Sequence, residues 1–69
     1  MREEVRALLK KCGRTQRWLR FALEDRGRII NIVLLNDYLT GARKTKQGDE
    51  VIALSYQILK EEEAHETNL

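Results

Sequence analysis

The sequence predicts an all-α protein, a compact bundle of four to five short helices. Apolar residues recur at helical spacing through most of the 69-residue chain. No proline occurs, and four glycines, at positions 13, 27, 41 and 48, divide the chain into segments of helix length. No pair of segments alternates with the period of two that paired strands require. These three observations favour linked helices over any sheet.

The length predicts a single domain, which we expect to comprise residues 1–63, followed by a flexible acidic tail at residues 64–69. Cys12 is the only cysteine, so neither an intramolecular disulfide nor a CxxC zinc site is expected. The N-terminus lacks an apolar signal-peptide core, and no apolar run approaches the roughly 18 residues of a membrane span. We therefore expect a cytoplasmic protein without membrane contact.

Charge is distributed unevenly along the chain. Residues 1–46 hold twelve Lys/Arg and five Asp/Glu, a net charge of +7, whereas residues 47–69 hold one Lys and six Asp/Glu, a net charge of −5. A basic body with an acidic end is typical of a chain that meets a polyanion through one part. The alternative is that both regions are ordinary solvated faces, and charge alone leaves the two interpretations open.

The first two helices are predicted from apolar stripes between glycines. The stripe of the first is formed by Val5, Leu8, Leu9 and Cys12, and that of the second by Trp18, Leu19, Ala22 and Leu23. Acidic residues at the start of the first helix and lysines at its end match the helix dipole. Gly13 ends this helix, and Thr15 is a suitable N-cap for the next.

The most apolar stretch, RIINIVLLNDYLTG, is compatible with a strand or a helix when read alone. Its β-branched residues suggest a strand, but no other segment offers such a strand a partner. As a helix it begins at Asn31 or Ile32, with Asn31 as the cap, and ends at Thr40 before Gly41. We predict this third helix. A polar, basic connection, GARKTKQGDE, then leads into a last amphipathic helix, DEVIALSYQILKEEE.

Together these segments resemble the phage repressor and Cro-like helix-turn-helix family, the lambda-repressor-like DNA-binding domains. LLKKCGRTQRWL resembles the family's first helix and the Thr-Gln pair that opens its second, LLNDYLTGARK resembles its recognition helix and basic loop, and DEVIALSYQIL resembles its fourth helix. The resemblance covers residues 5 to about 60 and rests on the order and spacing of the segments. It implies a DNA-binding transcriptional regulator of phage or mobile-element type, with the third helix in the major groove and a homodimer on a two-fold symmetric site.

The resemblance also implies roles for particular residues. The exposed N-terminal half of the recognition helix, which contacts base edges, corresponds to Asn31, Ile32, Val33 and Asn36. The basic loop along the DNA backbone corresponds to Arg43, Lys44 and Lys46, and the inward side of the helix to Leu35 and Leu39. Gln16 matches a position that touches phosphate or holds the recognition side chains. Arg14 and Arg17, near the start of the same helix, share the phosphate role.

Two features depart from the family pattern. The connection EDRGRII is several residues longer than the usual turn, and it adds Arg28 as a candidate guanine or phosphate contact. Ile32 and Val33 occupy positions that are usually polar, where an aliphatic side chain contacts a thymine methyl group but forms no hydrogen bond. Asn36 keeps the bidentate capacity for adenine, as does Asn31 if it is not used for capping.

The apolar segment Ile32, Val33 and Leu34 motivates an alternative function, because a row of exposed aliphatic side chains tends to mark a contact surface. The same fold would then be an interaction module, such as an antirepressor or co-regulator that binds another DNA-binding protein. Catalysis is not expected, since the chain has one serine, no glycine-rich phosphate loop and no cluster with metal-ligand spacing. We expect no catalytic residue, metal site or cofactor, and we interpret Glu61 to Glu63 as a solvated helix end.

Overall fold

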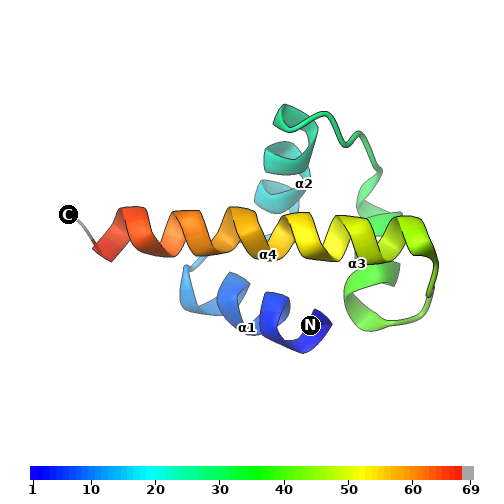
Figure 1. The fold of residues 1–69 in the computed structure, drawn as a ribbon, viewed down its shortest axis with the longest axis horizontal. Coiled ribbons are helices and arrows are strands. Elements are labelled where there is room, and N and C mark those ends of the chain that lie inside the picture. The colour runs from blue at the N-terminus through cyan, green and yellow to red at the C-terminus, as the bar shows by residue number, and fades with distance from the viewer. Residues whose placement is uncertain (68–69) are drawn as a thin grey trace.

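The structure is a computed structural model that describes residues 1–67, and within them it contains four helices and no strand. α4 (Lys46–Thr67) runs the length of the molecule and packs against the three shorter helices (Figure 1). α1 (Arg2–Lys11) and α2 (Gln16–Asp25) lie on opposite sides of it, and α3 (Ile32–Thr40) packs against all three other helices near the start of α4. The predicted all-α class is confirmed.

The ends of α1 and α2 follow the local signals of the sequence. Gly13 adopts a positive φ of 67°, where a side chain would be strained, and so turns the chain after α1. The Thr15 hydroxyl accepts a hydrogen bond from the Trp18 N–H at 3.1 Å, which satisfies one of the free donors at the start of α2. The turn at Gly13 and the cap at Thr15 together determine where α2 begins.

The ambiguous apolar stretch is a helix, as predicted. The Asn31 side chain accepts a hydrogen bond from the Leu34 N–H at 2.7 Å, and α3 ends at Gly41, whose φ is 84°. Leu35 and Leu39 are completely buried, as the resemblance implies. Leu35 and Leu39 are buried against three other helices, so this segment is stable as a helix and needs no neighbouring strand.

α4 is longer at both ends than the sequence suggests. It begins at Lys46, inside the segment predicted to be a loop, because the Thr45 hydroxyl accepts a hydrogen bond from the Gly48 N–H at 3.0 Å and caps the helix. At the other end it continues to Thr67, so the predicted domain boundary after residue 63 falls inside a helix. Residues 68–69, the end of the predicted tail, lie outside the described residues, and a flexible tail stays a prediction.

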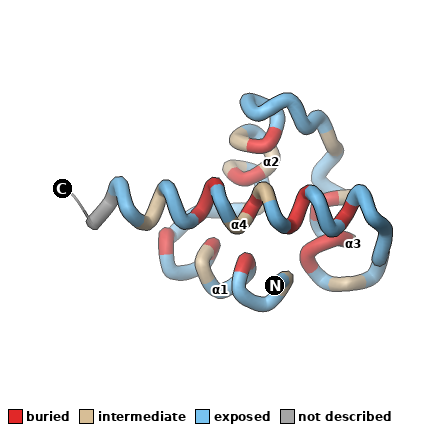
Figure 2. The backbone as a smooth tube through the Cα atoms, viewed as in Figure 1, coloured by how far each residue is buried: buried red, intermediate tan, exposed pale blue. Residues whose placement is uncertain are grey.

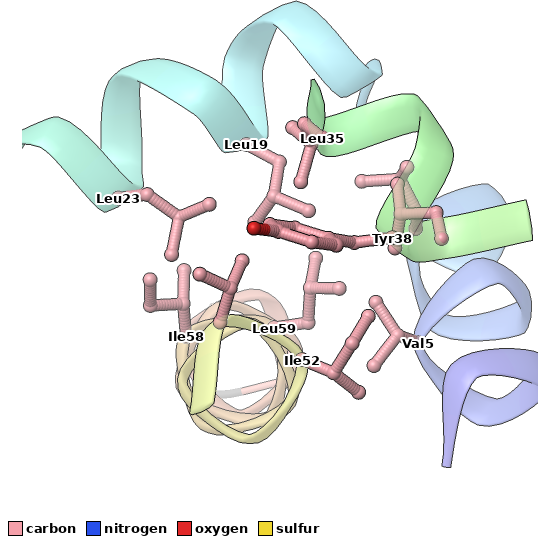
Figure 3. Packing of buried hydrophobic residues seen from close by; sticks show 11 residues of the cluster. Val5, Leu19, Leu23, Leu35, Tyr38, Ile52, Ile58 and Leu59 are labelled. Atoms are coloured by element: carbon pink, nitrogen blue, oxygen red, sulfur yellow. The ribbon is translucent and has the colours of Figure 1, made fainter. Parts of the chain in front are cut away.

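Every helix contributes to one hydrophobic core (Figures 2 and 3). Its buried members are Val5, Leu9, Leu19, Leu23, Leu35, Tyr38, Leu39, Val51, Ile52, Ile58 and Leu59. Figure 3 shows the ring of Tyr38 at the centre of this cluster, between side chains of α2 and α4. The core holds α3 by one side only, so its other side faces solvent.

Gly48 allows this close approach of α3 to α4. A Cβ atom at Gly48 would lie 2.7 Å from Cδ1 and 2.8 Å from Cε1 of the Tyr38 ring, well inside van der Waals contact. The helical backbone itself would accept any residue there, because Gly48 has no positive φ. The glycine is therefore required by packing and not by the backbone conformation.

We expect Gly48→Ala to lower the free energy of unfolding by about 1–3 kcal/mol, because the added methyl group overpacks the contact with Tyr38. Helix propensity alone would give the opposite result, a gain of about 1 kcal/mol. Urea unfolding followed by circular dichroism measures the difference. Ala53→Gly, at an exposed position of the same helix, serves as the control and should follow propensity. A Gly48→Ala variant more stable than the native chain would contradict this packing argument.

Candidate nucleic-acid interface

The start of α2 and the outward face of α3 are joined by one side-chain hydrogen bond. Gln16 Nε2 donates to Asn36 Oδ1 at 3.2 Å, across twenty positions of sequence. Gln16 is placed by the Thr15 cap, and Asn36 is exposed on α3, next to its buried side. Because Gln16 donates to one lone pair of Oδ1, the Nδ2 group of Asn36 keeps both hydrogens available.

Asn31 and Arg28, two predicted base contacts, are engaged within the chain. The side-chain oxygen of Asn31 caps α3, which settles the question that the sequence left open. Arg28 Nη2 donates to Glu50 Oε2 at 3.1 Å and so ties the α2–α3 connection to the first turns of α4. Both partners of this pair are almost half exposed, so the pair contributes little to stability and remains open to exchange.

The apolar residues at the start of α3 divide between solvent and core. Ile32 is 40% exposed and Val33 is 67% exposed, whereas Leu34 is partly buried against the core. Of the three residues of the predicted partner surface, two therefore face outward and the third serves mainly in packing. Ile29, in the α2–α3 connection, is 78% exposed and was not among the predicted site residues. Its sequence neighbours gave no clear signal of this exposure, since Arg28 precedes it but the apolar Ile30 follows it.

Four of the predicted phosphate-binding cations are exposed and have no ion-pair partner among the described residues. They are Arg17 at the start of α2, Arg43 and Lys44 in the α3–α4 loop, and Lys46 at the start of α4. None of them forms an ion pair or a side-chain hydrogen bond with a described residue. The loop is folded back on α3, because the Arg43 N–H donates to the Asp37 carbonyl oxygen at 3.2 Å.

Arg43 also borders an open hollow of about 250 Å³ beside α3, together with Asn31, Val33, Leu34 and Asp37. Asp37 is the one acidic residue of α3. Its carboxylate repels phosphate groups but accepts hydrogen bonds from amino groups. The hollow thus combines an aliphatic wall, a cation and an acceptor.

Other cations are neutralised by the acidic end of α4. Lys11 Nζ lies 2.8 Å from Glu63 Oε2, and Arg26 Nη2 lies 2.7 Å from Glu61 Oε1. Arg14 Nε donates to Glu62 Oε2 at 2.8 Å. The run Glu61 to Glu63 is therefore not merely a solvated helix end, because it connects α4 to α1, to the α1–α2 loop and to the end of α2.

Arg14 is thereby held in an internal contact. Besides its ion pair with Glu62, its guanidinium group lies over the Trp18 ring, 5.1 Å from the centroid. The ring is itself half-buried against the core. Of the two arginines near the start of α2 that the sequence suggested for phosphate, only Arg17 is left without a partner among the described residues.

No group of three or more histidine, cysteine or carboxylate side chains within residues 1–65 is placed to hold a metal ion. None of the helices in the same part of the chain has both the length and the apolar character to cross a bilayer. No protein-family model matches the chain, and searches of curated proteins and of solved structures found no match. The side-chain arrangement described above therefore carries the functional interpretation.

The ion pairs at the end of α4 predict acid sensitivity. The hydrogen bond from Arg26 lowers the pKa of Glu61 below its ordinary value of 4.5, and hydrogen bonds from Lys11 and then Lys60 lower the pKa of Glu63. Because these pKa values are lower in the folded state, the stabilisation is present above the ordinary pKa and is lost as the pH falls through the lowered values.

We expect the thermal midpoint to fall as the pH is lowered from about 5 to about 3, with part of this fall due to Glu61 and Glu63. The control is Glu61→Gln with Glu63→Gln, because glutamine does not ionise. This double variant should start from a lower midpoint and lose less of it in acid. Parallel curves for the two proteins would show that these ion pairs do not contribute.

Proposed function

We propose that this chain is a DNA-binding transcriptional regulator of phage or mobile-element type, with α3 in the major groove of duplex DNA. The observation that carries the proposal is the Gln16–Asn36 hydrogen bond, which joins the start of α2 to the outward face of α3. In helix-turn-helix proteins, residues near the N-terminus of the second helix of the motif contact base edges while the first helix crosses the backbone. Such a contact links the two helices of the proposed reading surface.

The distribution of charge supports the same function. Glutamates on α4 neutralise Lys11, Arg14 and Arg26 at one end of the bundle. Seven cations have no ion-pair partner among the described residues; Arg17, Arg43, Lys44 and Lys46 belong to the start of α2, the α3–α4 loop and the start of α4, and Arg2, Arg6 and Lys10 belong to α1. Exposed cations attract phosphate and release counterions when they bind it, so four of them give a salt slope of about −4 per protomer.

Asn36 is the best placed of the polar side chains for base reading. With Gln16 on one lone pair of Oδ1, the amide still offers Nδ2 hydrogens and a second lone pair, the combination that pairs with adenine. A single helix covers few base pairs, however, and its discrimination is correspondingly small. We therefore propose a homodimer on a two-fold symmetric site.

Selection of bound duplexes from a random DNA pool, at low and at near-physiological salt, tests this function. Enrichment of a two-fold symmetric motif is the expected result, and it would also give the operator sequence. Enrichment of an asymmetric motif would support DNA reading but remove the dimer. No enrichment at either salt would contradict the proposal.

We expect Lys44→Ala combined with Lys46→Ala to weaken binding to all duplexes alike and to flatten the salt slope by about 2, because two phosphate contacts are lost. Binding measured by fluorescence anisotropy across a salt series gives the slope. Lys11→Ala with Lys60→Ala is a matched control, since it removes the same charge from lysines that are paired with Glu63. If both double variants change the slope equally, the loop lysines have no special role.

We expect Asn36→Ala to relax the preference at one base position and to leave the others intact. Gln16→Ala should relax the same position more weakly, because Gln16 acts by holding the Asn36 amide. Repeating the selection with each variant measures both effects. The assignment fails if Asn36→Ala weakens binding uniformly across sequences, or if the two variants change different positions.

A second candidate function is favoured by the exposed apolar side chains at the start of α3. Ile29, Ile32 and Val33 lie within five positions of each other and all face solvent. A row of this kind also suits an interaction module that binds another DNA-binding regulator. The random-pool selection discriminates between the two functions, because such a module would enrich no duplex when tested alone.

A further inference from the structure

Ile32 and Val33 surround Asn36 on the outward face of α3. Residues three and four positions apart are neighbours on a helix, so Asn36 lies one turn beyond both aliphatic side chains. Ile32 is 40% exposed and Val33 is 67% exposed, although each would gain from burial. The structure thus leaves an amide and two aliphatic groups together at the position proposed to meet base edges.

The surroundings of this trio favour a polyanion as the group that covers it. Gln16 holds Asn36 from one side, and Arg43 borders the hollow next to Val33 on the other. Arg43 and the following Lys44 have no acidic partner among the described residues. The rim also carries one carboxylate, Asp37, so with Arg43 and Lys44 it keeps a net positive charge. An apolar patch with a net positive rim complements a surface that presents apolar groups between phosphates. The major groove of DNA presents such groups only at the C5-methyl positions of pyrimidines.

We propose that Ile32 and Val33 read the C5-methyl group of thymine, next to the base pair that Asn36 contacts. The inference rests on the proposed DNA-binding function and names the bases that the site prefers. A preferred half-site then contains at least one thymine within a base pair or two of the position read by Asn36. A 5-methylcytosine carries its methyl group at the same place, so the shared chemistry is a C5-methyl pyrimidine.

Replacing thymine by deoxyuridine, one position at a time, tests the inference. The exchange keeps every hydrogen-bonding group of the base pair and removes only the methyl group. We expect the affinity to fall roughly fourfold at one or two positions per half-site, the factor that corresponds to one buried methyl-sized group. A cytosine at the same position should bind more tightly once it is methylated at C5, but less tightly than thymine, because the hydrogen-bonding groups of its base pair are wrong.

Protein variants connect the methyl effect to a side chain. Val33→Ala removes two exposed methyl groups and leaves the core untouched, which circular dichroism verifies. This variant should bind the thymine duplex more weakly than the native chain. It should also lose less affinity when thymine is replaced by deoxyuridine, because the protein change and the base change remove the same contact. Phe21→Ala is the matched control, because Phe21 is an apolar side chain of α2 that is 51% exposed. It should show the full loss on deoxyuridine that the native chain shows.

The possible outcomes separate this inference from the function on which it rests. A sequence-selective chain that binds every deoxyuridine duplex as tightly as its thymine parent reads DNA without the methyl groups, and only the present inference fails. If Val33→Ala loses as much affinity as the native chain when thymine is replaced by deoxyuridine, Val33 does not contact the methyl group. That result would also overturn the present inference. A chain that binds no duplex overturns both proposals and leaves a protein partner as the occupant of Ile32 and Val33.

Discussion

The contact between Tyr38 and the backbone at Gly48 determines how α3 is presented to solvent. The Tyr38 ring is buried at the centre of the core and approaches α4 more closely than a Cβ atom at Gly48 would permit. With Tyr38, Leu35 and Leu39 all directed into the core, the exposed surface of α3 includes Ile32, Val33 and Asn36. The same contact holds the end of α3 near the start of α4, so the short loop between them keeps its cations beside α3.

The acidic end of α4 has its effect through charge distribution more than through stability. Exposed ion pairs of this kind contribute little to stability. Together, however, Glu61, Glu62 and Glu63 neutralise cations that belong to α1, α2 and the loop between them. Part of the basic body is thereby neutralised, whereas the cations of the α3–α4 loop have no such partner among the described residues. Such an asymmetric field orients a protein as it approaches a charged partner, and it weakens with added salt.

Local signals in the sequence were sufficient to predict the helices but not all of their partners. Thr15, Asn31 and Gly41 act within a few residues, so the bounds of α2 and α3 were predictable from neighbouring side chains. The start of α4 was missed because a glycine at position 48 resembles a loop signal. The structure explains this glycine by the close Tyr38 ring, which belongs to another helix. Ion pairs such as Arg14–Glu62 join residues 48 positions apart, a relation that no periodicity reveals. The pairing of Gln16 with Asn36 was suggested only by the family resemblance, and the base and phosphate contacts themselves stay predictions.

The proposed reading face, with two aliphatic side chains and one amide, would set an upper limit on specificity. A mismatched base opposite Ile32 or Val33 would leave no buried protein hydrogen bond unsatisfied, so the penalty would be only the lost methyl contact, about 1 kcal/mol. Asn36 would add about 1–3 kcal/mol against a wrong base. Under the proposed function, one protomer would gain most of its affinity from phosphates and discriminate modestly, whereas two protomers on a symmetric site would double the discriminating free energy. Selective binding through so small an apolar face would thus require a second reading element, and a second copy of the chain is the simplest one.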